Sequence, residues 1–337
     1  MAEPSSVGKG AALPAAERRP APTPGEALLA VWDRYGILIA LLVVSLTIGA
    51  LEPVFFSPIN ILNVVRQISI IGIIAVGETM VILLGGIDLS VGSVVAFTGA
   101  VAATLMVPLA QPIPLAVAAA LLVGLAIGFL NGFVSRKGGM HPFIVTLGTL
   151  SVCRGLTLIL AGGRPISGLP EAFLWLGGGE VGPIPVPVIL FLGLVVLAGF
   201  VLRRTTFGRS IYAIGGNEEA ARLSGVAVDR IYIATFALAG LLSGLAGLVL
   251  TSRLNSAELV AGQGYELDVI AAVVIGGTSL FGGVGSVYGT LVGALLIGVI
   301  SNGLNLLGVS SYWQLVVKGL VIVVAALIDN LKRRFRR

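Results

Sequence analysis

Seven ionisable residues lie within or beside long apolar stretches, where a charge is costly enough to suggest a function. They are Arg66, Glu78, Asp88, Arg154, Glu266, Asp268 and Lys318. Arg66 and the last three stand close enough to the ends of apolar runs to reach a membrane interface. Asp88 falls in a turn expected at the cytoplasmic face, where it can cap a helix that begins near Ser90. These five positions therefore have structural explanations.

Glu78 and Arg154 are harder to explain, because both stand well inside apolar runs. An internal ion pair between them is one possibility, and contact with a solvated cavity or a substrate is another. The third is that the bounds of the two expected spans are wrong. Glu78 is also the only plausible start of a titratable relay, which an ion-coupled transporter would need.

Uncharged polar side chains inside the apolar runs offer a different chemistry. A neutral sugar needs donors and acceptors that match its hydroxyl groups, with few charges along its route. Together with Glu78, the candidate substrate-pathway residues are Gln67, Asn131, Thr146, Asn302 and Asn305, and Gln314 offers the same chemistry. The alternative for each is a hydrogen bond to a neighbouring helix.

The sequence offers little to a metal, a cofactor or a catalytic nucleophile. His141 precedes Pro142 at the start of an expected span, which favours a helix-entry role over a proton relay. Cys153 is the only cysteine and lies in an apolar run, so packing is its expected role. There are no clustered metal-binding acids, paired histidines or nucleophile elbow. We expect no metal, no cofactor and no enzymatic activity.

Composition places these residues in a membrane protein. Of 337 residues, 56% are hydrophobic and 11% are charged, with a mean hydropathy of +1.04, whereas soluble domains carry about 25% charged residues. The formal charge of +5 resides in short clusters at the ends of apolar segments, a pattern that orients helices in a bilayer. This composition excludes an ordinary soluble enzyme and argues against nucleic acid as a partner.

The apolar runs predict an all-α polytopic protein with about ten transmembrane helices. The expected spans are 35–51, 64–84, 91–107, 114–134, 142–161, 184–202, 231–250, 268–282, 286–307 and 311–328. Residues 1–34 are expected to form a flexible cytoplasmic tail, 35–330 the transmembrane domain and 331–337 a basic cytoplasmic tail. With both termini inside, the basic loop 203–230 is cytoplasmic and the acidic segment with Glu171 and Glu180 is outside.

Two features modify this simple count. The segment 268–282 is short and glycine-rich, so we expect a broken helix buried among its neighbours. An internal repeat pairs Val81–Gly86 and Val91–Val94 with Val274–Gly277 and Val284–Val287. Six spans between the copies predict two parallel pseudo-repeats. The alternative is that glycine-rich membrane helices resemble one another by composition.

The long loop 203–230 predicts a short cytoplasmic helix. Asn217 can act as its N-cap, and Gly225 can end it. Glu218 and Glu219 stand near the positive end of the helix dipole. An exposed face with Ala220, Ala221 and Leu223 would suit docking into the groove of a partner, although a solvated connection is the simpler explanation.

Four further motifs accompany the Glu219–Gly225 segment. They are Gly85–Ser93 (GGIDLSVGS), Pro142–Thr149 (PFIVTLGT), Gly264–Asp268 (GYELD) and Ala271–Ser279 (AAVVIGGTS). In this order they resemble the permease subunits of ribose-, xylose- and galactoside-type ABC importers, over about residues 35–330. The resemblance implies coupling through Asn217, Glu218, Glu219, Ala220, Ala221 and Gly225. Only the Pro-rich tail falls outside it.

The resemblance also implies partners and a location. The partners are a second permease subunit, a separate ATP-binding subunit and an extracytoplasmic sugar-binding protein, and the location is a bacterial inner membrane. The sequence agrees with this division of labour, because it holds no phosphate-binding loop and Gly8–Gly10 lacks the required glycine and hydroxyl. We therefore expect a monosaccharide permease, with a ribose-type pentose favoured. A branched-chain amino acid permease and an ion-coupled secondary transporter are the alternatives.

Overall fold

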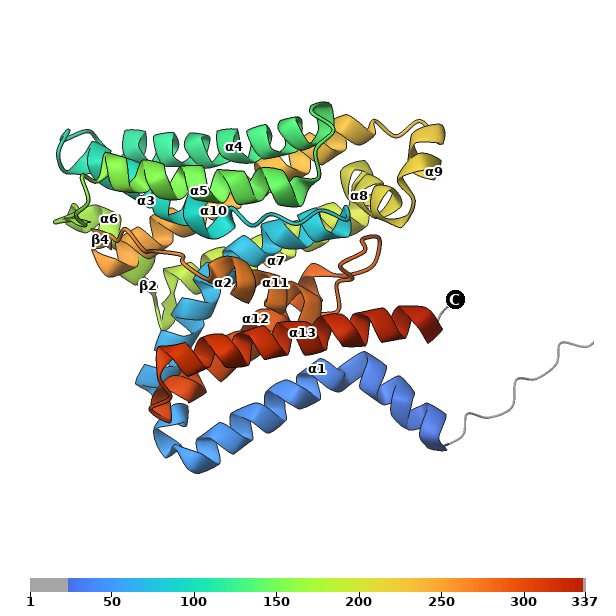
Figure 1. Cartoon of the computed structure of the whole chain (residues 1–337). Coiled ribbons are helices and arrows are strands. Elements are labelled where there is room, and N and C mark those ends of the chain that lie inside the picture. Colours follow the sequence, from blue (N-terminus) through green and yellow to red (C-terminus); the bar gives the residue numbers. More distant parts are fainter. Residues whose placement is uncertain (1–23, 336–337) are drawn as a thin grey trace, which may run out of the picture. The chain divides into compact units, whose positions relative to one another are not determined.

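The structure, a computed structural model, describes residues 24–335 (Figure 1). The chain divides into two compact units, residues 1–36 and 37–337. Helix α1 (Pro24–Leu51) begins in the first unit and ends in the second. The part of the expected basic tail at 336–337 and most of the expected N-terminal tail, residues 1–23, lie outside the described residues.

The second unit is helical, with two very short antiparallel ribbons. After α1 come η1 (Pro53–Phe56), α2 (Pro58–Leu83), α3 (Val91–Met106), α4 (Ile113–Lys137), α5 (Pro142–Leu160), β1 (Ile166–Ser167), α6 (Glu171–Gly178), β2 (Glu180–Val181), β3 (Ile184–Pro185), α7 (Val186–Arg204), α8 (Thr206–Gly216), α9 (Glu218–Leu223), α10 (Val228–Leu254), β4 (Ser256–Ala257), α11 (Tyr265–Ile275), α12 (Val287–Leu306) and α13 (Ser311–Phe335). Strand β1 pairs with β4 and β2 with β3. The predicted all-α polytopic class is confirmed.

Six described helices are long and apolar enough to cross a membrane: α2, α4, α5, α7, α10 and α12. Three shorter apolar helices, Tyr35–Leu51, Val91–Met106 and Ser311–Val324, add to them. Within the expected span 268–282, α11 ends at Ile275, and residues 276–286 are not helical. The interruption expected there is therefore present.

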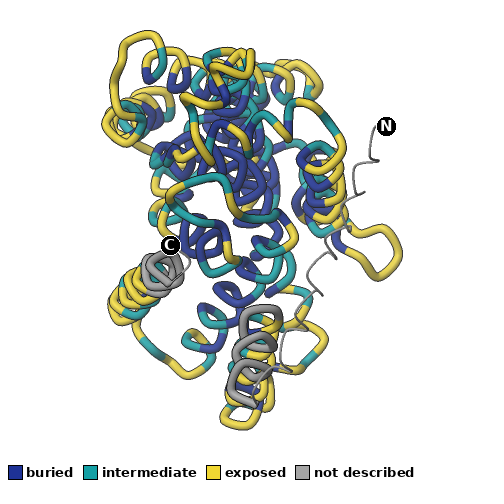
Figure 2. The backbone as a smooth tube through the Cα atoms, turned by 90° about the vertical axis from the view of Figure 1, so that its right-hand side faces the viewer, coloured by how far each residue is buried: buried dark blue, intermediate teal, exposed yellow. Residues whose placement is uncertain are grey.

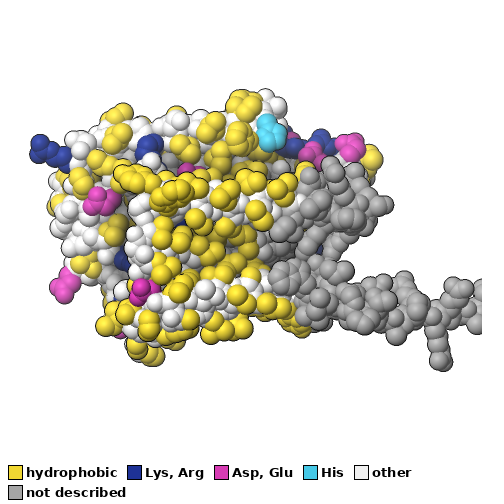
Figure 3. Space-filling model, turned by 60° about the horizontal axis from the view of Figure 1, so that its bottom comes forward, with side chains coloured by type: hydrophobic (Ala, Val, Ile, Leu, Met, Phe, Trp, Pro, Cys, Tyr) yellow, Lys and Arg dark blue, Asp and Glu magenta, His cyan; other side chains and the backbone are white. Residues whose placement is uncertain are grey.

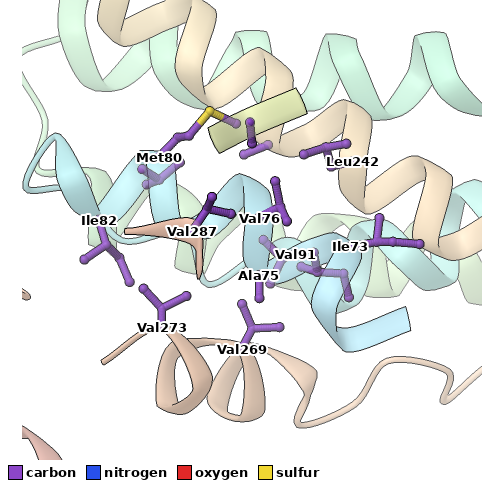
Figure 4. Close-up of a cluster of buried hydrophobic side chains, with 14 of the residues drawn as sticks. Ile73, Ala75, Val76, Met80, Ile82, Val91, Leu242, Val269, Val273 and Val287 are labelled. Carbon is purple, nitrogen blue, oxygen red and sulfur yellow. The ribbon is translucent and has the colours of Figure 1, made fainter. Parts of the chain in front are cut away.

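Helix α2 forms the centre of the second unit. Every residue from Ile68 to Leu84 is buried, and α7, α10, α11 and α12 pack against it. Figure 4 shows how Ile73 and Val76 of α2, Val269 and Val273 of α11, Leu242 of α10 and Val287 of α12 meet in the largest apolar cluster. The buried segments lie in the interior of the bundle in Figure 2.

The periphery has the opposite character, because its apolar side chains point outward. Ile159 of α5 is 77% exposed and Val196 of α7 is 64% exposed. Hydrophobic side chains cover much of the face in Figure 3. An apolar exterior around a buried centre is the arrangement that a bilayer requires of a polytopic protein.

Glycine permits a close contact between α4 and α10. A Cβ atom built on Gly240 would lie 2.3 Å from the carbonyl oxygen of Gly124 and 2.8 Å from the Cα of Gly128. A Cβ on Gly128 would lie 2.2 Å from the carbonyl oxygen of Phe236. The two backbones therefore touch directly, as at small-residue interfaces of membrane helices.

The two copies of the expected repeat share the way in which their first helix ends. Helix α2 is followed by Gly85 at φ +82° and α11 by Gly277 at φ +88°. In both cases the amide of the next residue donates to the carbonyl oxygen five residues back. The later part of the proposed alignment differs, because Gly92 lies inside α3 whereas Gly285 precedes α12. The non-helical segments, 84–90 and 276–286, also differ in length.

Replacing Gly240 with valine should destabilise the bundle. The added atoms would overlap the backbone of α4, so we expect a loss of about 1–3 kcal/mol in the free energy of unfolding. The measurement is thermal unfolding in detergent. Gly148→Val is the matched control, because Gly148 lies on exposed α5 with no atom within 4 Å of a built Cβ. Equal unfolding temperatures for both variants would contradict the close contact.

Candidate functional site

The loop 203–230 folds into two short helices, α8 and α9, at the opposite end of the second unit from α6 and β4 (Figure 1). Thr205 caps α8 by accepting a hydrogen bond from the amide of Gly208 at 3.2 Å. Ile211 and Ile214 of α8 are buried. One face of α8 is thus anchored in the core, and the loop contains two helices where the sequence predicted one.

Helix α9 has the ends that the sequence predicted. Oδ1 of Asn217 accepts a hydrogen bond from the amide of Ala220 at 3.0 Å, and Gly225 adopts φ +83° after the helix. Ala220 and Glu219 are exposed. The prediction that Ala221 is exposed is wrong, because it is 4% exposed and packs in the main apolar cluster. Leu223 is 81% exposed, so it is the apolar side chain that α9 offers to a partner.

Arg136, in the last turn of α4, joins α9 to α10. Its guanidinium donates to Oε1 of Glu218 at 2.5 Å and to Oε2 at 3.2 Å, and its Nε donates to Oδ1 of Asp229 at 2.9 Å. The same group lies over the ring of Tyr232, 5.4 Å from its centre. We call this arrangement of Arg136 with Glu218 and Asp229 the Arg136 clamp. It is a bidentate contact with one helix and a charge-assisted bond to another.

Two more cations complete the surroundings of the clamp. Lys137 binds Asp229 at 2.5 Å, and Arg222 binds Glu218 at 2.7 Å. The hydrogen bond from Arg136 holds the pKa of the Glu218 carboxyl below its usual value, and Arg222 adds to this effect. A cavity of about 410 Å³ opens beside the clamp and is lined in part by Arg222, Lys137 and Arg230.

Arg136 was not among the coupling residues expected from the sequence. From the sequence, Arg136 is only part of a short basic cluster at the end of an apolar run, which would orient a span in the membrane. Its partners are 82 and 93 positions away, and no local pattern links an arginine to carboxylates at such distances. The acidic start of α9 was the only available signal, because carboxylates there can attract a cation from elsewhere in the fold.

A second polar group lies in the interior, around the non-helical segment 84–90. Oε1 of Glu78 accepts from the amide of Asp88 at 3.0 Å, and Oδ1 of Asp88 accepts from the amide and hydroxyl of Ser90 at 2.8 and 2.6 Å. Asn131 donates to the hydroxyl of Ser90 at 3.0 Å and accepts from Thr149 at 2.6 Å. We call this set the interior network.

The interior network corrects one expectation and excludes one of the alternatives given for Glu78. Asp88 is 1% exposed and therefore does not lie in a turn at the surface. Glu78 does not pair with Arg154, whose Nη1 donates to the carbonyl oxygens of Leu259 and Ala261 at 3.1 and 2.9 Å. Thr146 joins the network from α5 by accepting from the amide of Leu89 at 3.2 Å. Glu78, Asn131 and Thr146 thus hold the non-helical segment 84–90 in place.

Asn302 and Asn305 lie elsewhere, at contacts of α12. Asn302 and Asn60 exchange two amide hydrogen bonds, of 2.9 and 3.0 Å. Oδ1 of Asn305 accepts from Gln314 at 2.8 Å. These amides bond neighbouring elements, which is the alternative explanation given for them. The structure does not bring them together with Glu78, Asn131 and Thr146.

The remaining ionisable groups are paired or peripheral. Arg66 forms an ion pair with Glu180. Asp268 is 5% exposed and binds Lys318 at 2.8 Å, so the expectation that Asp268 reaches an interface is wrong. His141 is exposed and its Nδ1 accepts from the amide of Phe143 at 3.3 Å, which confirms its helix-entry role.

Cys153 is buried, as expected of a packing residue. Among the described residues, no group of three or more His, Cys, Asp or Glu side chains could hold a metal ion.

Gln67 lines a cavity. This cleft, of about 410 Å³, lies between α2, the end of α10 and the loop that leads to α11. It is lined by Gln67, Leu250, Arg253, Leu254, Glu258, Val260, Ala261, Gly262, Gln263 and Tyr265. Nothing in the sequence linked Gln67 to the loop residues.

These features define a class of protein. Apolar helices cross the membrane, polar groups hold interrupted segments inside the bundle, and a short helix with an exposed apolar residue projects from one end. This is the arrangement of a multi-pass membrane transport protein.

Comparison with known proteins identifies the family. A family model described as "Branched-chain amino acid transport system / permease component" matches residues 60–326. The chain belongs to this family. It is therefore a permease component of a transport system, and the predictions of a permease rather than an enzyme are confirmed.

The relatives resemble the chain over most of their length. The ribose import permease protein RbsC of Bacillus subtilis is 50% identical over 90% of this chain and 94% of its own. RbsC of Haemophilus influenzae is 51% identical over 87% and 91%. The D-allose transport system permease protein AlsC of Escherichia coli is 42% identical over 89% and 92%. No solved structure matches the chain.

Removing the Arg136 clamp should loosen α9. Arg136→Gln loses both charged contacts, so we expect backbone amides of residues 217–225 to exchange with solvent about tenfold faster. Hydrogen–deuterium exchange with mass spectrometry measures this rate. Arg209→Gln is the control, since Arg209 is an exposed arginine on α8. Unchanged exchange in Arg136→Gln would show that the clamp does not hold α9.

The same experiment has a defined pH dependence. Since the folded-state pKa of Glu218 is lowered, its contribution is fully present above the unfolded-state pKa and is lost as pH falls through the folded-state value. The protection of α9 should therefore be constant from neutral pH to the ordinary glutamate range and decline only below it. Loss of protection already at pH 6 to 7 would contradict this sign.

Proposed function

We propose that this chain is the membrane permease of an ATP-driven importer for a monosaccharide, with ribose favoured. The observation that carries the proposal is about 50% identity to ribose import permeases over nearly their whole length. The D-allose permease, at 42% identity, and the L-arabinose permeases, at 39% and 38%, are less similar, which favours ribose over these sugars. The description of the family model supports branched-chain amino acids as the second candidate.

In this proposal the chain crosses the membrane ten times, with both termini inside. The six long helices, the three shorter apolar helices and α11 would supply the ten crossings. Arg136, Lys137, Arg203 and Arg204 at the ends of α4 and α7 would then face the cytoplasm. The similar ends of α2 and α11 support two parallel pseudo-repeats. The cell (inner) membrane of a bacterium is the proposed location, because the relatives are transport permeases of bacteria.

The proposed partners follow from the same surfaces. A separate ATP-binding subunit would dock on α9, where Leu223 supplies an apolar contact and the cavity beside the Arg136 clamp offers cations to acidic side chains. Movement of α9 would pass through Arg136 to α4 and α10. At the opposite end, a sugar-binding protein would deliver its ligand through a transient polar contact. A second copy of the permease would complete the pathway.

The assignment of the coupling residues is also part of the proposal. Asn217 and Gly225 define the ends of α9, and Ala221 fixes it to the core. Glu218 takes part in the clamp, whereas Glu219 and Ala220 are exposed toward a partner.

Leu223→Asp tests the proposed docking site. A charge in place of the apolar contact should lower stimulation of the ATPase by the loaded binding protein at least about tenfold. The measurement is ATP hydrolysis in lipid vesicles that contain the permease and its cognate ATPase, and Leu223→Met is the conservative control. Both variants should keep the unfolding temperature, because the side chain is exposed.

Two outcomes would count against the proposal. Stimulation that survives Leu223→Asp and Gly225→Asp together would remove α9 as the coupling element. Uptake of ribose by the permease alone, driven by a proton or sodium gradient, would replace the importer with a secondary transporter.

A further inference from the structure

Polar side chains of the membrane domain fall into two groups according to whether the fold already uses them. The interior network satisfies Asn131 and Thr146 with partners at 2.6 to 3.2 Å. The amides of Asn302 and Asn305 are bonded as well. Such groups have little remaining capacity for a passing ligand, because a new bond would have to break an existing one.

The cleft at Gln67 has the opposite property. In the described part of the chain, the side chains of Gln67, Gln263, Arg253, Glu258 and Tyr265 make no hydrogen bond or ion pair to another residue. Their donors and acceptors are therefore available to whatever enters the cleft. The cleft volume, about 410 Å³, lies within the range of about 300–1,000 Å³ typical of small-molecule sites.

The lining also indicates the chemistry of a ligand. One guanidinium and one carboxylate, Arg253 and Glu258, leave the cleft without net charge. The amides of Gln67 and Gln263 each donate and accept, as hydroxyl groups do. The ring of Tyr265 and the side chains of Leu250, Leu254 and Val260 provide apolar surface for C–H groups. This combination suits a neutral polyhydroxylated molecule better than an ion.

The position of the cleft suits a transient binding site along a transport route. The loop behind it is held by Arg154 through the carbonyl groups of Leu259 and Ala261. On its inner side the loop touches the start of α3, where a Cβ on Gly262 would lie 2.3 Å from the carbonyl oxygen of Gly92. The cleft thus ends at the helix start that the interior network holds. Strand β4, which lies between the end of α10 and this loop, is at the end of the second unit away from α9 (Figure 1).

We infer that this cleft is a sugar subsite of the permease, in which Gln67 and Gln263 bind hydroxyl groups of a monosaccharide after its release by the binding protein. The inference rests on the proposed function. It separates Gln67 from the other candidate pathway residues and adds Gln263. Because the site offers the sugar only a few hydrogen bonds, it binds weakly, and a transported molecule can leave it again.

The test is the number of D-ribose molecules transported per ATP hydrolysed. The permease is reconstituted in lipid vesicles. Its ATPase and ATP are inside the vesicles, and the ribose-loaded binding protein is outside. The double variant Gln67→Leu/Gln263→Leu removes both amides while keeping side-chain size. We expect transport per ATP to fall about tenfold, at about two- to tenfold for each lost hydrogen bond. Stimulated ATP hydrolysis should stay within about a factor of two.

The control is Gln111→Leu, which removes an exposed amide that does not line the cleft. It should leave both measurements unchanged. If the double variant assembles poorly, the two single variants are measured instead. Both should fold, because Gln67 lies on a helix that tolerates leucine and Gln263 lies on an exposed loop.

Three results separate the possible failures. Wild-type transport per ATP in the double variant overturns the sugar subsite and leaves the proposed function intact. An equal loss of ATP hydrolysis and transport also overturns it, since the amides would then serve docking of the binding protein. No ribose transport by the wild-type assembly contradicts the proposed function itself.

Discussion

Inside a bilayer, every backbone amide and carbonyl group must find its partner within the protein. Most of the described residues meet that requirement within helices, and the segments 84–90 and 276–286 are two of the interruptions between them. At the first of these, side chains replace the missing helical hydrogen bonds: Glu78 accepts from the amide of Asp88 and Thr146 from that of Leu89. At the second, the amide of Gly283 reaches the carbonyl oxygen of Leu83, 2.9 Å away. The two interruptions therefore support each other.

The two interrupted segments pack closely against the backbone of α8. A Cβ on Gly215 of α8 would lie 1.8 Å from the carbonyl oxygen of Leu83 and 2.5 Å from the amide of Gly283. The end of α8 is thus wedged against both interrupted segments. Since α8 leads directly into α9, the proposed displacement of α9 would act on the same backbone groups of Leu83 and Gly283. The glycines at the α4–α10 contact extend this direct coupling to the helices that the Arg136 clamp joins.

Charged groups at the two ends of the membrane domain have different tasks. At the α9 end, carboxylates and guanidinium groups neutralise one another in the Arg136 clamp, which fixes the geometry of α9. In the cleft at the other end, the polar groups face a cavity and have no partner among the described residues. Rigid coupling at one end and unused hydrogen-bonding capacity at the other suit a permease that transmits force and conducts a polar ligand.

The sequence by itself determined the membrane class, the approximate spans, the ends of α9 and the family, because each depends on local composition or on a contiguous motif. Asn217 and Gly225 could be placed from capping preferences alone. Only the tertiary structure decided that Asp88 is buried, that Arg154 holds a loop instead of pairing with Glu78, and that Arg136 joins α4 to two other helices. Those outcomes depend on partners as far as 107 residues apart in the chain. Helical periodicity specifies which residues share a face, but it does not specify which distant face is packed against them.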